Sequence, residues 1–251
     1  MSFVKHNSSQ YPQQLTREAD GLELLRKTIK ENKIPYLHIP KVESVTETEL
    51  TLQKIATTSS TKENMKQLGE GLAKLHAIQF EQFGLEKDNY IGLNPQMNGT
   101  YKSWGEFFFE QRLLFQVNLV RQSRIKNNFL MILHEHRAAL VSWLDESCAY
   151  PSLVHGDLWS GNVLFDNKGP WLIDPAVYYG DREVDLAMSE MFGGFNHHFY
   201  DAYDEVLPRT TEYDTKKTVY NLYHYLNHFN LFGEGYLSAC QRGMEVVKEL
   251  K

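Results

Sequence analysis

The sequence of 251 residues predicts an α+β fold of two lobes, a small N-terminal lobe with strands (residues 1–56) and a mainly helical C-terminal lobe (residues 57–251). Short β-like runs flank a single helical pattern before residue 56, and a small polar stretch over residues 56–61 follows them. Beyond this stretch, apolar residues recur at spacings of three and four over most of the chain.

Composition sets limits on the class of protein. The chain is 42% hydrophobic and 23% charged, as in ordinary globular proteins, and its net charge of −6 argues against binding to nucleic acid or to an anionic membrane. No apolar run has the length needed to span a bilayer, and the first residues lack the pattern of a signal peptide. Cys148 and Cys240 lie far apart and form no metal-ligand pair, so a cytoplasmic protein is the simplest expectation.

The N-terminal lobe is expected to begin with a strand over residues 3–5, followed by a helix over residues 14–31. Lys5 ends that strand and Glu18 lies on the first full turn of that helix. A solvated surface charge is the commoner fate of both residues. The alternative is the lysine–glutamate pair that positions the α- and β-phosphates in kinases. Two further strands are predicted over residues 41–46 and 49–55.

The C-terminal lobe is expected to be helical from Thr61 onward, with His76 as a structural histidine packed against the core. Residues 83–101, rich in Gly, Asn and Pro, are predicted to form a long irregular loop, which in a compact domain is usually functional. Ser103 caps a long predicted helix over residues 103–125, and a second helix follows over residues 127–144.

The last helices are predicted over residues 182–192, 195–207 and 215–250. His224 and His228 are four apart in the last of these, but they lack the glutamate and the third ligand of a metal site. An aromatic packing helix is the favoured interpretation of that segment.

Residues 153–185 carry the chemistry. His155-Gly156-Asp157 is followed by Asn162, and then by two β-like runs that flank the polar turn over residues 166–169. A hairpin of this kind would bring Asn162 and Asp174 to neighbouring strand ends, with Asp157 on the loop that enters it. Two carboxylates and an amide oxygen are the hard oxygen donors that Mg²⁺ prefers.

The order D-x-x-x-x-N, followed by an aspartate linked through a hairpin, is the catalytic arrangement of protein kinases. Asp157 is then the base that orients the attacking hydroxyl, and Asn162 and Asp174 hold the metal against the nucleotide phosphates. The alternative is an acidic surface hairpin. It is disfavoured because the carboxylates are embedded among apolar residues, where an unpaired charge is costly. We therefore expect ATP and Mg²⁺ as cofactors.

HGDLWSGN (residues 155–162) and IDPAVYYGDREVDLAMSEMFGGF (residues 173–195) resemble the fructosamine kinase, or ketosamine-3-kinase, family. This family is a branch of the protein-kinase-like fold and is related to the aminoglycoside phosphotransferases and choline kinases. An F-V-K strand, an E-A-x-G-L-x-L-L helix and a W-x-x-F-F-x-E-x-R-L-x-x-Q segment extend the resemblance over nearly the whole chain.

The resemblance implies ATP- and Mg²⁺-dependent phosphorylation of the 3-hydroxyl of a small or protein-bound ketosamine, of the fructosamine or ribulosamine type, which leads to deglycation of the amine. It also supports Lys5 and Glu18 as the phosphate-positioning pair. In this fold, backbone groups near the hinge hold the adenine, and the candidates here are Leu52, Gln53, Lys54 and Ile55.

The resemblance also indicates the acceptor side of the site. Trp159 is a candidate wall for the sugar or amine, with packing into the core as an equal alternative. Asp185, with His155, is expected to hold the catalytic loop, although Asp185 could equally be an ordinary acid in the first turn of a helix. Asp181, Arg182 and Glu183 are expected to form a local charge network beside the pocket. Weaker candidates for contact with substrate are Asn89, Tyr90, Ile91 and Gly92.

The chain departs from the kinase-like pattern at its start. Only four residues precede Lys5, so the Gly-rich hairpin that covers the phosphates has no counterpart here. The expected N-terminal sheet is thus truncated, whether by nature or by loss, with weakened ATP binding and an exposed edge through which the chain could self-associate.

Three alternatives to a ketosamine kinase stay open from the sequence. One is a catalytically impaired or non-catalytic kinase-like protein, which the missing loop would suit. The second is a related kinase of the aminoglycoside or choline type. A metal-dependent hydrolase is the least favoured of the three, because Asn162 and the Lys5–Glu18 pair would then have no purpose.

Overall fold

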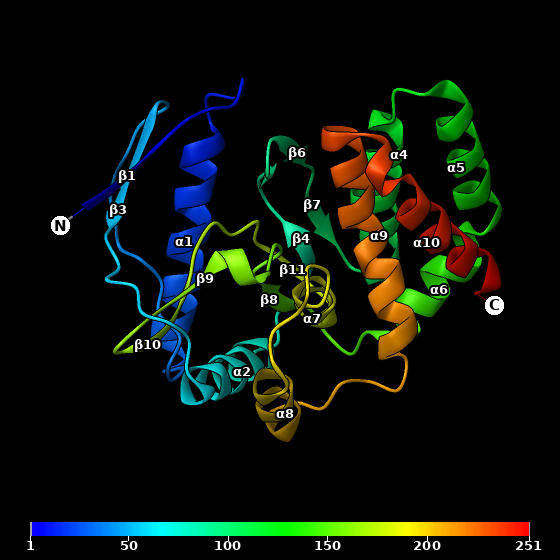
Figure 1. The fold of residues 1–251 in the computed structure, drawn as a ribbon. Helices are drawn as coiled ribbons and strands as arrows, with labels where there is room; N and C mark the ends of the chain where they lie inside the picture. The colour runs from blue at the N-terminus through cyan, green and yellow to red at the C-terminus, as the bar shows by residue number, and fades with distance from the viewer. Residues whose placement is uncertain (1, 251) are drawn as a thin grey trace.

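The computed structural model describes residues 2–250, and its N-terminal part is a three-stranded antiparallel sheet beside one long helix (Figure 1). The sheet has the order β1-β3-β2, with β1 over Ser2–His6, β2 over Val42–Val45 and β3 over Glu49–Gln53. The helix α1 covers Gln14–Glu31, as predicted. On the edge strand β1, Phe3 is 52% and Val4 is 44% exposed, and self-association through this edge stays a prediction.

The helix α1 forms because its apolar residues fall on one face at helical spacing. That face is buried, and it consists of Leu15, Ala19, Leu22, Leu25 and Ile29. Each leucine buried in this way stabilises the fold by roughly 1.5–3 kcal/mol. On β3, Leu50 and Leu52 are buried and alternate with half-exposed neighbours, as the two-residue period of a strand requires.

The helix α2 (Lys62–His76) begins at a capping box, in which the Thr61 hydroxyl accepts the Asn64 N–H at 3.1 Å and the Asn64 side chain accepts the Thr61 N–H at 3.2 Å. It packs closely against α8 (His197–Val206) at the bottom of Figure 1. A Cβ atom on Gly69 would lie 2.2 Å from the Phe199 carbonyl oxygen, so the two helices approach at a glycine.

The remaining helices form the right half of Figure 1 and its centre, beside the hairpin between Asn162 and Asp174, which is called the catalytic hairpin below. They are α3 (Trp104–Phe107), a π-helix over Phe108–Leu114, α4 (Phe115–Leu119), α5 (Ser123–Glu135), α6 (Arg137–Ser147), α7 (Glu183–Ser189), α9 (Tyr213–Phe232) and α10 (Leu237–Glu249). Short 3₁₀ turns cover Ser160–Asn162 and Glu234–Tyr236.

Two hairpins and a four-stranded sheet join these helices to α1. The catalytic hairpin pairs β9 (Val163–Asp166) with β10 (Gly169–Leu172), which confirms the predicted hairpin to within two residues. A second hairpin pairs β5 (Asn89–Ile91) with β6 (Asn94–Gln96). The sheet has the order β7-β4-β11-β8, from Gly99–Tyr101, Phe83–Leu85, Tyr178–Gly180 and Ser152–Val154.

The irregular loop predicted for residues 83–101 is wrong, because this segment forms the four short strands β4 to β7. Each strand has only three residues, too few for a two-residue alternation to show in the sequence. Gly92 lies in the turn between β5 and β6, whereas Gly84 and Gly99 lie within β4 and β7, and all three have positive φ.

The long helix predicted over residues 103–125 is also wrong in extent. It ends at Leu119 and contains a π-helical segment, and the next helix is divided at His136 into α5 and α6. The buried part of this segment is wider than one face of a regular α-helix, because four of its side chains are buried together. These are Phe107, Phe108, Phe109 and Arg112.

The core has two parts. One is made by α3 to α6, α9 and α10 with the four-stranded sheet, and the other joins α1 and β3 to α2, α8 and the catalytic hairpin. The second part contains residues from both sides of position 56, so the N-terminal sheet and helix share their core with the rest of the chain. Within residues 2–250, no helix combines the length and the apolar character needed to cross a membrane.

Candidate active site

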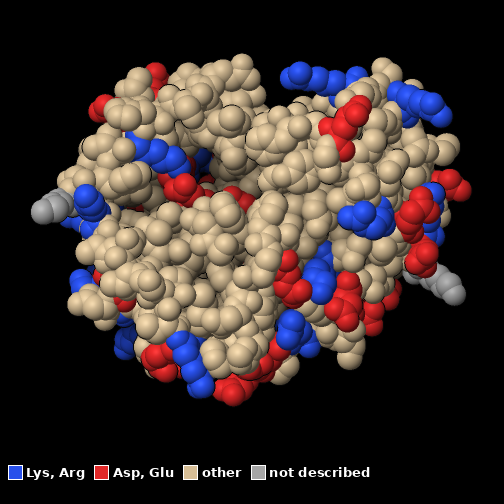
Figure 2. Space-filling model, in the orientation of Figure 1, with Lys and Arg blue, Asp and Glu red and all other residues tan. Residues whose placement is uncertain are grey.

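A cavity of about 210 Å³ lies where α1, the catalytic loop and the β5–β6 hairpin meet. Figure 2 shows the surface hollowed in this region, with acidic and basic side chains gathered inside the hollow. The predicted site residues that line the cavity are Lys5, Glu18, Asn89, Tyr90, Gly92, Asp157, Trp159, Asn162 and Asp174. Residues that sequence reasoning missed also line it, and these are Gln14, Arg17, Pro175 and Ala176.

Lys5 lies between two carboxylates. Its Nζ is 2.7 Å from Oε2 of Glu18 and 3.2 Å from Oδ2 of Asp174. Burial alone would lower the pKa of Lys5, but the two carboxylates outweigh this effect and raise the pKa above its ordinary value. The ammonium group is therefore charged throughout the physiological range, and it joins β1, α1 and the end of the catalytic hairpin.

Asp157 is fixed by Asn162. The Asn162 Nδ2 donates to the Asp157 carbonyl at 2.8 Å and to its carboxylate Oδ2 at 3.0 Å. Burial raises the pKa of Asp157 to about 7, against the hydrogen bond from Asn162, which lowers it. With Nδ2 bonded to Asp157, the group that Asn162 could offer to a metal in the cavity is its amide oxygen.

The backbone around Asp174 is unusual. Asp174 has φ of +52°, in the left-handed region that non-glycine residues seldom adopt. The segment is held on one side by the Ile173 N–H, which donates to the Asn162 carbonyl at 3.1 Å, and on the other by the Ala176 N–H, which donates to the His155 carbonyl at 2.9 Å. Such conformations persist where the surroundings over-determine them, and they cluster at functional sites.

His155 and Gly156 bring the catalytic loop against this segment. The buried His155 ring bonds the Ile173 carbonyl through Nε2 at 2.9 Å and accepts the Asp157 N–H at Nδ1. Burial lowers the pKa of His155, which is consistent with this neutral form. Gly156 has φ of +80°, and a Cβ atom there would lie 2.1 Å from the Ala176 carbonyl oxygen.

Asp185 lies beneath the catalytic loop. Its carboxylate accepts the N–H groups of His155 at 2.7 Å and Gly156 at 2.8 Å. It is also 3.2 Å from Nε2 of His76, whose Nδ1 bonds the Tyr203 hydroxyl at 2.9 Å. Burial alone would raise the pKa of Asp185, but the hydrogen bonds from His76 and His155 hold it below its ordinary value. The structural role predicted for His76 is confirmed, but its partners were not predicted.

Trp159 is half-buried at the mouth of the cavity, and its ring meets Phe192 edge-on with centroids 5.7 Å apart. The indole lies across Gly161, where a Cβ atom would be only 2.2 Å from the ring. The Trp-Ser-Gly order therefore lets a large aromatic side chain fold back over the loop that carries Asn162. Trp159 is neither in the core nor fully exposed.

Some of the other predicted binding residues line the cavity of 210 Å³, and the rest do not. Tyr90 and Gly92 face the cavity, whereas Ile91 is buried in the core beside them. Leu52 is buried in β3 and Gln53 ends that strand. Lys54 and Ile55 follow it on the way to α2, and these four hinge residues lie outside the lining of the 210 Å³ cavity.

The predicted charge network at residues 181–183 is buried and centred on a residue that was not predicted. Lys216 of α9 places Nζ 2.7 Å from Asp181 and 3.0 Å from Glu183. Arg182 lies 3.6 Å from Glu183 and also donates to the Tyr203 hydroxyl at 3.1 Å. The network fixes α7 against α9 and takes no part in lining the cavity.

The residues present fit a magnesium site. Asp174 offers a carboxylate whose side chain is 44% exposed, and Asn162 offers an amide oxygen beside it at the end of the same hairpin. With Asp157 they form a donor set of hard oxygens, without the thiolate or imidazole ligands that softer metals prefer.

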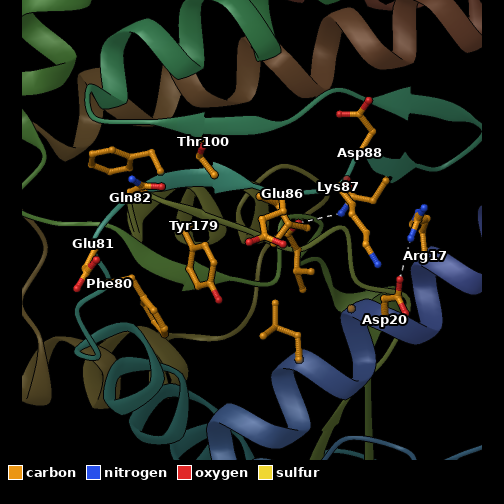
Figure 3. A pocket seen from close by; sticks show the side chains of 16 residues that line it. Arg17, Asp20, Phe80, Glu81, Gln82, Glu86, Lys87, Asp88, Thr100 and Tyr179 are labelled. Carbon is orange, nitrogen blue, oxygen red and sulfur yellow. Dashed lines mark hydrogen bonds and ion pairs between the residues drawn. The ribbon is translucent and has the colours of Figure 1, made fainter.

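A second cavity of about 510 Å³ lies next to the first, also against α1 (Figure 3). Arg17 and Asn89 line both cavities. Its aromatic wall is the pair Phe80 and Tyr179, with ring centroids 4.4 Å apart, and Figure 3 shows Glu86 and Lys87 near its centre. None of the residues expected to hold metal or phosphate line it, so the smaller cavity is the candidate active site.

Comparisons with known proteins identify the family of this chain. A model of the fructosamine kinase family matches residues 1–249. A probable ketoamine kinase of Vibrio parahaemolyticus is 39% identical over 245 residues, which cover 95% of this chain and 82% of the relative. The chloroplastic protein-ribulosamine 3-kinase of Arabidopsis thaliana is 37% identical over 95% of this chain and 73% of its own length.

Solved structures show the same fold. A fructosamine-3-kinase candidate of Thermobifida fusca superposes with a TM-score of 0.85 at 29% identity, covering 99% of this chain and 85% of that chain. An ADP-bound aminoglycoside phosphotransferase gives a TM-score of 0.61 at 15% identity, over 99% of this chain and 87% of that chain, and shows the fold alone. The predicted kinase-like α+β fold is confirmed, and the chain belongs to the fructosamine kinase family of phosphotransferases.

Proposed function

We propose that this protein transfers the γ-phosphoryl group of ATP to the 3-hydroxyl of a ketosamine, with Mg²⁺ as the metal. The observation that carries the proposal is the meeting of Lys5, Glu18, Asp157, Asn162 and Asp174 around one cavity. Relatives named ketoamine kinase and protein-ribulosamine 3-kinase support the choice of acceptor. Release of the amine from the phosphorylated ketosamine would make the process a deglycation of proteins or small amines.

Asp157 acts on the acceptor in this mechanism. Its carboxylate, oriented by Asn162 Nδ2 at 3.0 Å, orients the attacking hydroxyl and accepts its proton. The pKa of Asp157, raised to about 7 by burial, makes this carboxylate a better proton acceptor than an exposed aspartate. Asp185 and His155 hold the loop from behind, so Asp157 does not have to reorganise as the reaction proceeds.

The nucleotide side relies on charge. Mg²⁺, when bound by Asn162 and Asp174, would neutralise the negative charge on the β- and γ-phosphates. Lys5 steadies the α- and β-phosphates, and Glu18 keeps its ammonium in place at 2.7 Å. The adenine is assigned to backbone groups at the end of β3 and just after it, from Leu52 to Ile55, where the proposed lobes 1–56 and 57–251 meet.

The acceptor side is assigned to Trp159, Tyr90 and Gly92. Both aromatic rings are half-buried and line the cavity, which suits contact with the apolar faces of a sugar and its amine. Asn89 is a weaker choice than Tyr90, because its side-chain amide is already bonded within the protein. We place the enzyme in the cytoplasm, because Cys148 and Cys240 are both free thiols, as is usual in a reducing compartment.

The test is ATP consumption with Mg²⁺ and a panel of fructosyl-lysine, ribulosyl-lysine, an aminoglycoside and choline. We expect turnover with the ketosamines only, and a loss of about 10²–10⁴-fold in kcat for Asp157→Asn. Asp201→Asn, at an exposed acid on α8, is the matched control and should keep full activity. Phosphorylation of the aminoglycoside or choline alone would refute the acceptor assignment. Nucleotide binding without any turnover would favour a non-catalytic kinase-like protein.

A further inference from the structure

The β5–β6 hairpin contacts three separate parts of the molecule. Tyr90, Gly92 and Asn89 line the active-site cavity, but Asn89 and its cross-strand partner Gln96 are only 5% and 1% exposed. Their side-chain amides bond to other groups of the protein. The hairpin thus lines the acceptor side of the cavity and also buries two amide side chains.

The two buried amides hold the segment that follows Asp174. Asn89 Nδ2 donates to the Val177 carbonyl at 2.8 Å, and Gln96 Nε2 donates to the Ala176 carbonyl at 2.9 Å. These carbonyls lie two and three residues after Asp174, whose φ of +52° needs support from its surroundings. A buried carbonyl that loses its donor costs about 1–3 kcal/mol, so these bonds constrain the backbone strongly.

The amides are themselves fixed by a closed network. Gln96 Nε2 and Asn98 Nδ2 both donate to Oδ1 of Asn89, at 2.8 and 3.0 Å, and the Tyr223 hydroxyl donates to Oε1 of Gln96 at 2.8 Å. Arg112, from the π-helix, donates to Oδ1 of Asn98 at 2.9 Å. Among the described residues, the buried Arg112 guanidinium forms no salt bridge and instead lies 4.1 Å from the centre of the Tyr178 ring.

The hairpin also forms hydrogen bonds with the helices α1 and α9. Gln14 of α1 donates from Nε2 to the Gly92 carbonyl at 2.7 Å, four residues before Glu18. On the other strand, Asn94 donates to Asn227 of α9 at 2.8 Å. The same two strands therefore connect the helix that carries Glu18, the segment that carries Asp174 and the C-terminal helices.

We propose that the β5–β6 hairpin is a positioning element of the active site, in which Asn89 and Gln96 set the place of the Asp174 carboxylate. One rigid hairpin then fixes both the acceptor wall at Tyr90 and the metal ligand at Asp174. The inference rests on the proposed function in one respect only, which is that Asp174 binds the metal. Asn89 and Gln96 are positioning residues, because their side chains act through the backbone of the Asp174 segment.

The test measures metal binding directly, without turnover. Mn²⁺ is titrated by electron paramagnetic resonance in the presence of a non-hydrolysable ATP analogue. Gln96→Met keeps the length of the side chain and removes the donor to Ala176, and we expect it to weaken Mn²⁺ binding by about tenfold. Asn94→Ala, which cuts the tie to α9 on the same strand, should change Mn²⁺ binding by less than twofold.

Thermal midpoints of both variants separate positioning from loss of stability. A lower midpoint with unchanged Mn²⁺ binding in Gln96→Met would overturn the proposal and leave the network purely structural. Asp174→Asn is measured alongside. If Asp174→Asn binds Mn²⁺ as wild type does, the metal assignment of the proposed function has failed, whatever Gln96→Met does. Weaker binding in Asp174→Asn and Gln96→Met, but not in Asn94→Ala, supports the positioning role.

Discussion

At the scale of single residues, Gly161 decides where Trp159 lies. The indole crosses the Gly161 position so closely that any Cβ atom would meet the ring at 2.2 Å. We predict that Gly161→Ala displaces the ring and raises KM for the ketosamine several-fold, while KM for ATP stays within twofold. Steady-state kinetics with each substrate varied in turn will check this.

The control for this substitution is Gly235→Ala, where a Cβ atom would meet nothing within 4 Å. Because a flexible side chain can move aside, Gly161→Ala should cost little stability, and a changed thermal midpoint would point to misfolding of the loop instead. An unchanged KM for the ketosamine would remove Trp159 from the acceptor site.

Sequence reasoning reached part of the site at this scale. Asp157, Asn162 and Asp174 could be predicted together because a short hairpin leaves little freedom in where its strand ends lie. Pairings across long sequence separations could not be predicted. Asp185 and His76 are 109 positions apart, and only the packing of α2 beneath the catalytic loop brings them together.

At the scale of elements, the buried lysine on α9 is expected to hold α7 in place. Lys216 is 1% exposed in its side chain and neutralises both Asp181 and Glu183. Lys216→Met removes the cation shared by two buried carboxylates, of which Glu183 keeps only the more distant Arg182 at 3.6 Å, so we predict a loss of about 3–5 kcal/mol in the free energy of unfolding. Urea denaturation measures this loss.

The neighbouring lysine on α9 provides the matched control. Lys217 pairs with Glu190 at 2.9 Å, but its side chain is 31% exposed, so Lys217→Met should cost less than about 1 kcal/mol. Equal losses for the two variants would show that burial of the ion pair does not set its contribution. The sequence placed Asp181 and Glu183 in a charge network but gave no sign of Lys216, which lies over thirty positions away.

Elements themselves were predictable where they are long and periodic. The helix over residues 14–31 was predicted with its bounds, because one apolar stripe runs through all of it. The three-residue strands of residues 83–101 were not. β4 pairs with β7 and with the distant β11, and β5 and β6 are too short for a two-residue alternation to show. The π-helix at Phe108–Leu114 was missed because a run of aromatic residues in the sequence does not reveal how many faces of a helix are buried.

At the scale of the whole molecule, the two parts of the core do not follow the order of the chain. The N-terminal helix α1 shares its core with α2, α8 and the catalytic hairpin, so the active site lies on a single packed body. The division into lobes at residue 56 describes where the adenine is expected to bind rather than where packing stops. In a sequence, a lobe boundary is placed at a linker, and the pattern of residues does not show which helices and strands pack together across that linker.

The stability of the whole molecule should fall in mild acid because α9 buries a histidine in the C-terminal core. Burial lowers the pKa of His224 to about 3 from its ordinary 6.5, and facing His228 and Arg112 lower it further, against the opposing effect of Asp185. Below pH 6.5 the unfolded chain binds a proton at His224 that the folded chain does not. Stability is therefore lost as the pH falls from about 6.5 toward 3.

At pH 5.5, one unit below the ordinary pKa, this single residue should cost about 1.4 kcal/mol, or roughly 3–6 °C in melting temperature. His224→Phe fills a similar volume and cannot be protonated, so we predict a smaller drop in its melting temperature between pH 7.5 and 5.5 than in wild type. Calorimetry at both pH values measures the two drops. His197→Phe, at an exposed histidine of α8, should behave as wild type does. If His224→Phe loses as much on acidification as wild type, the acid sensitivity has its origin in other groups, and the buried histidine of α9 does not limit stability.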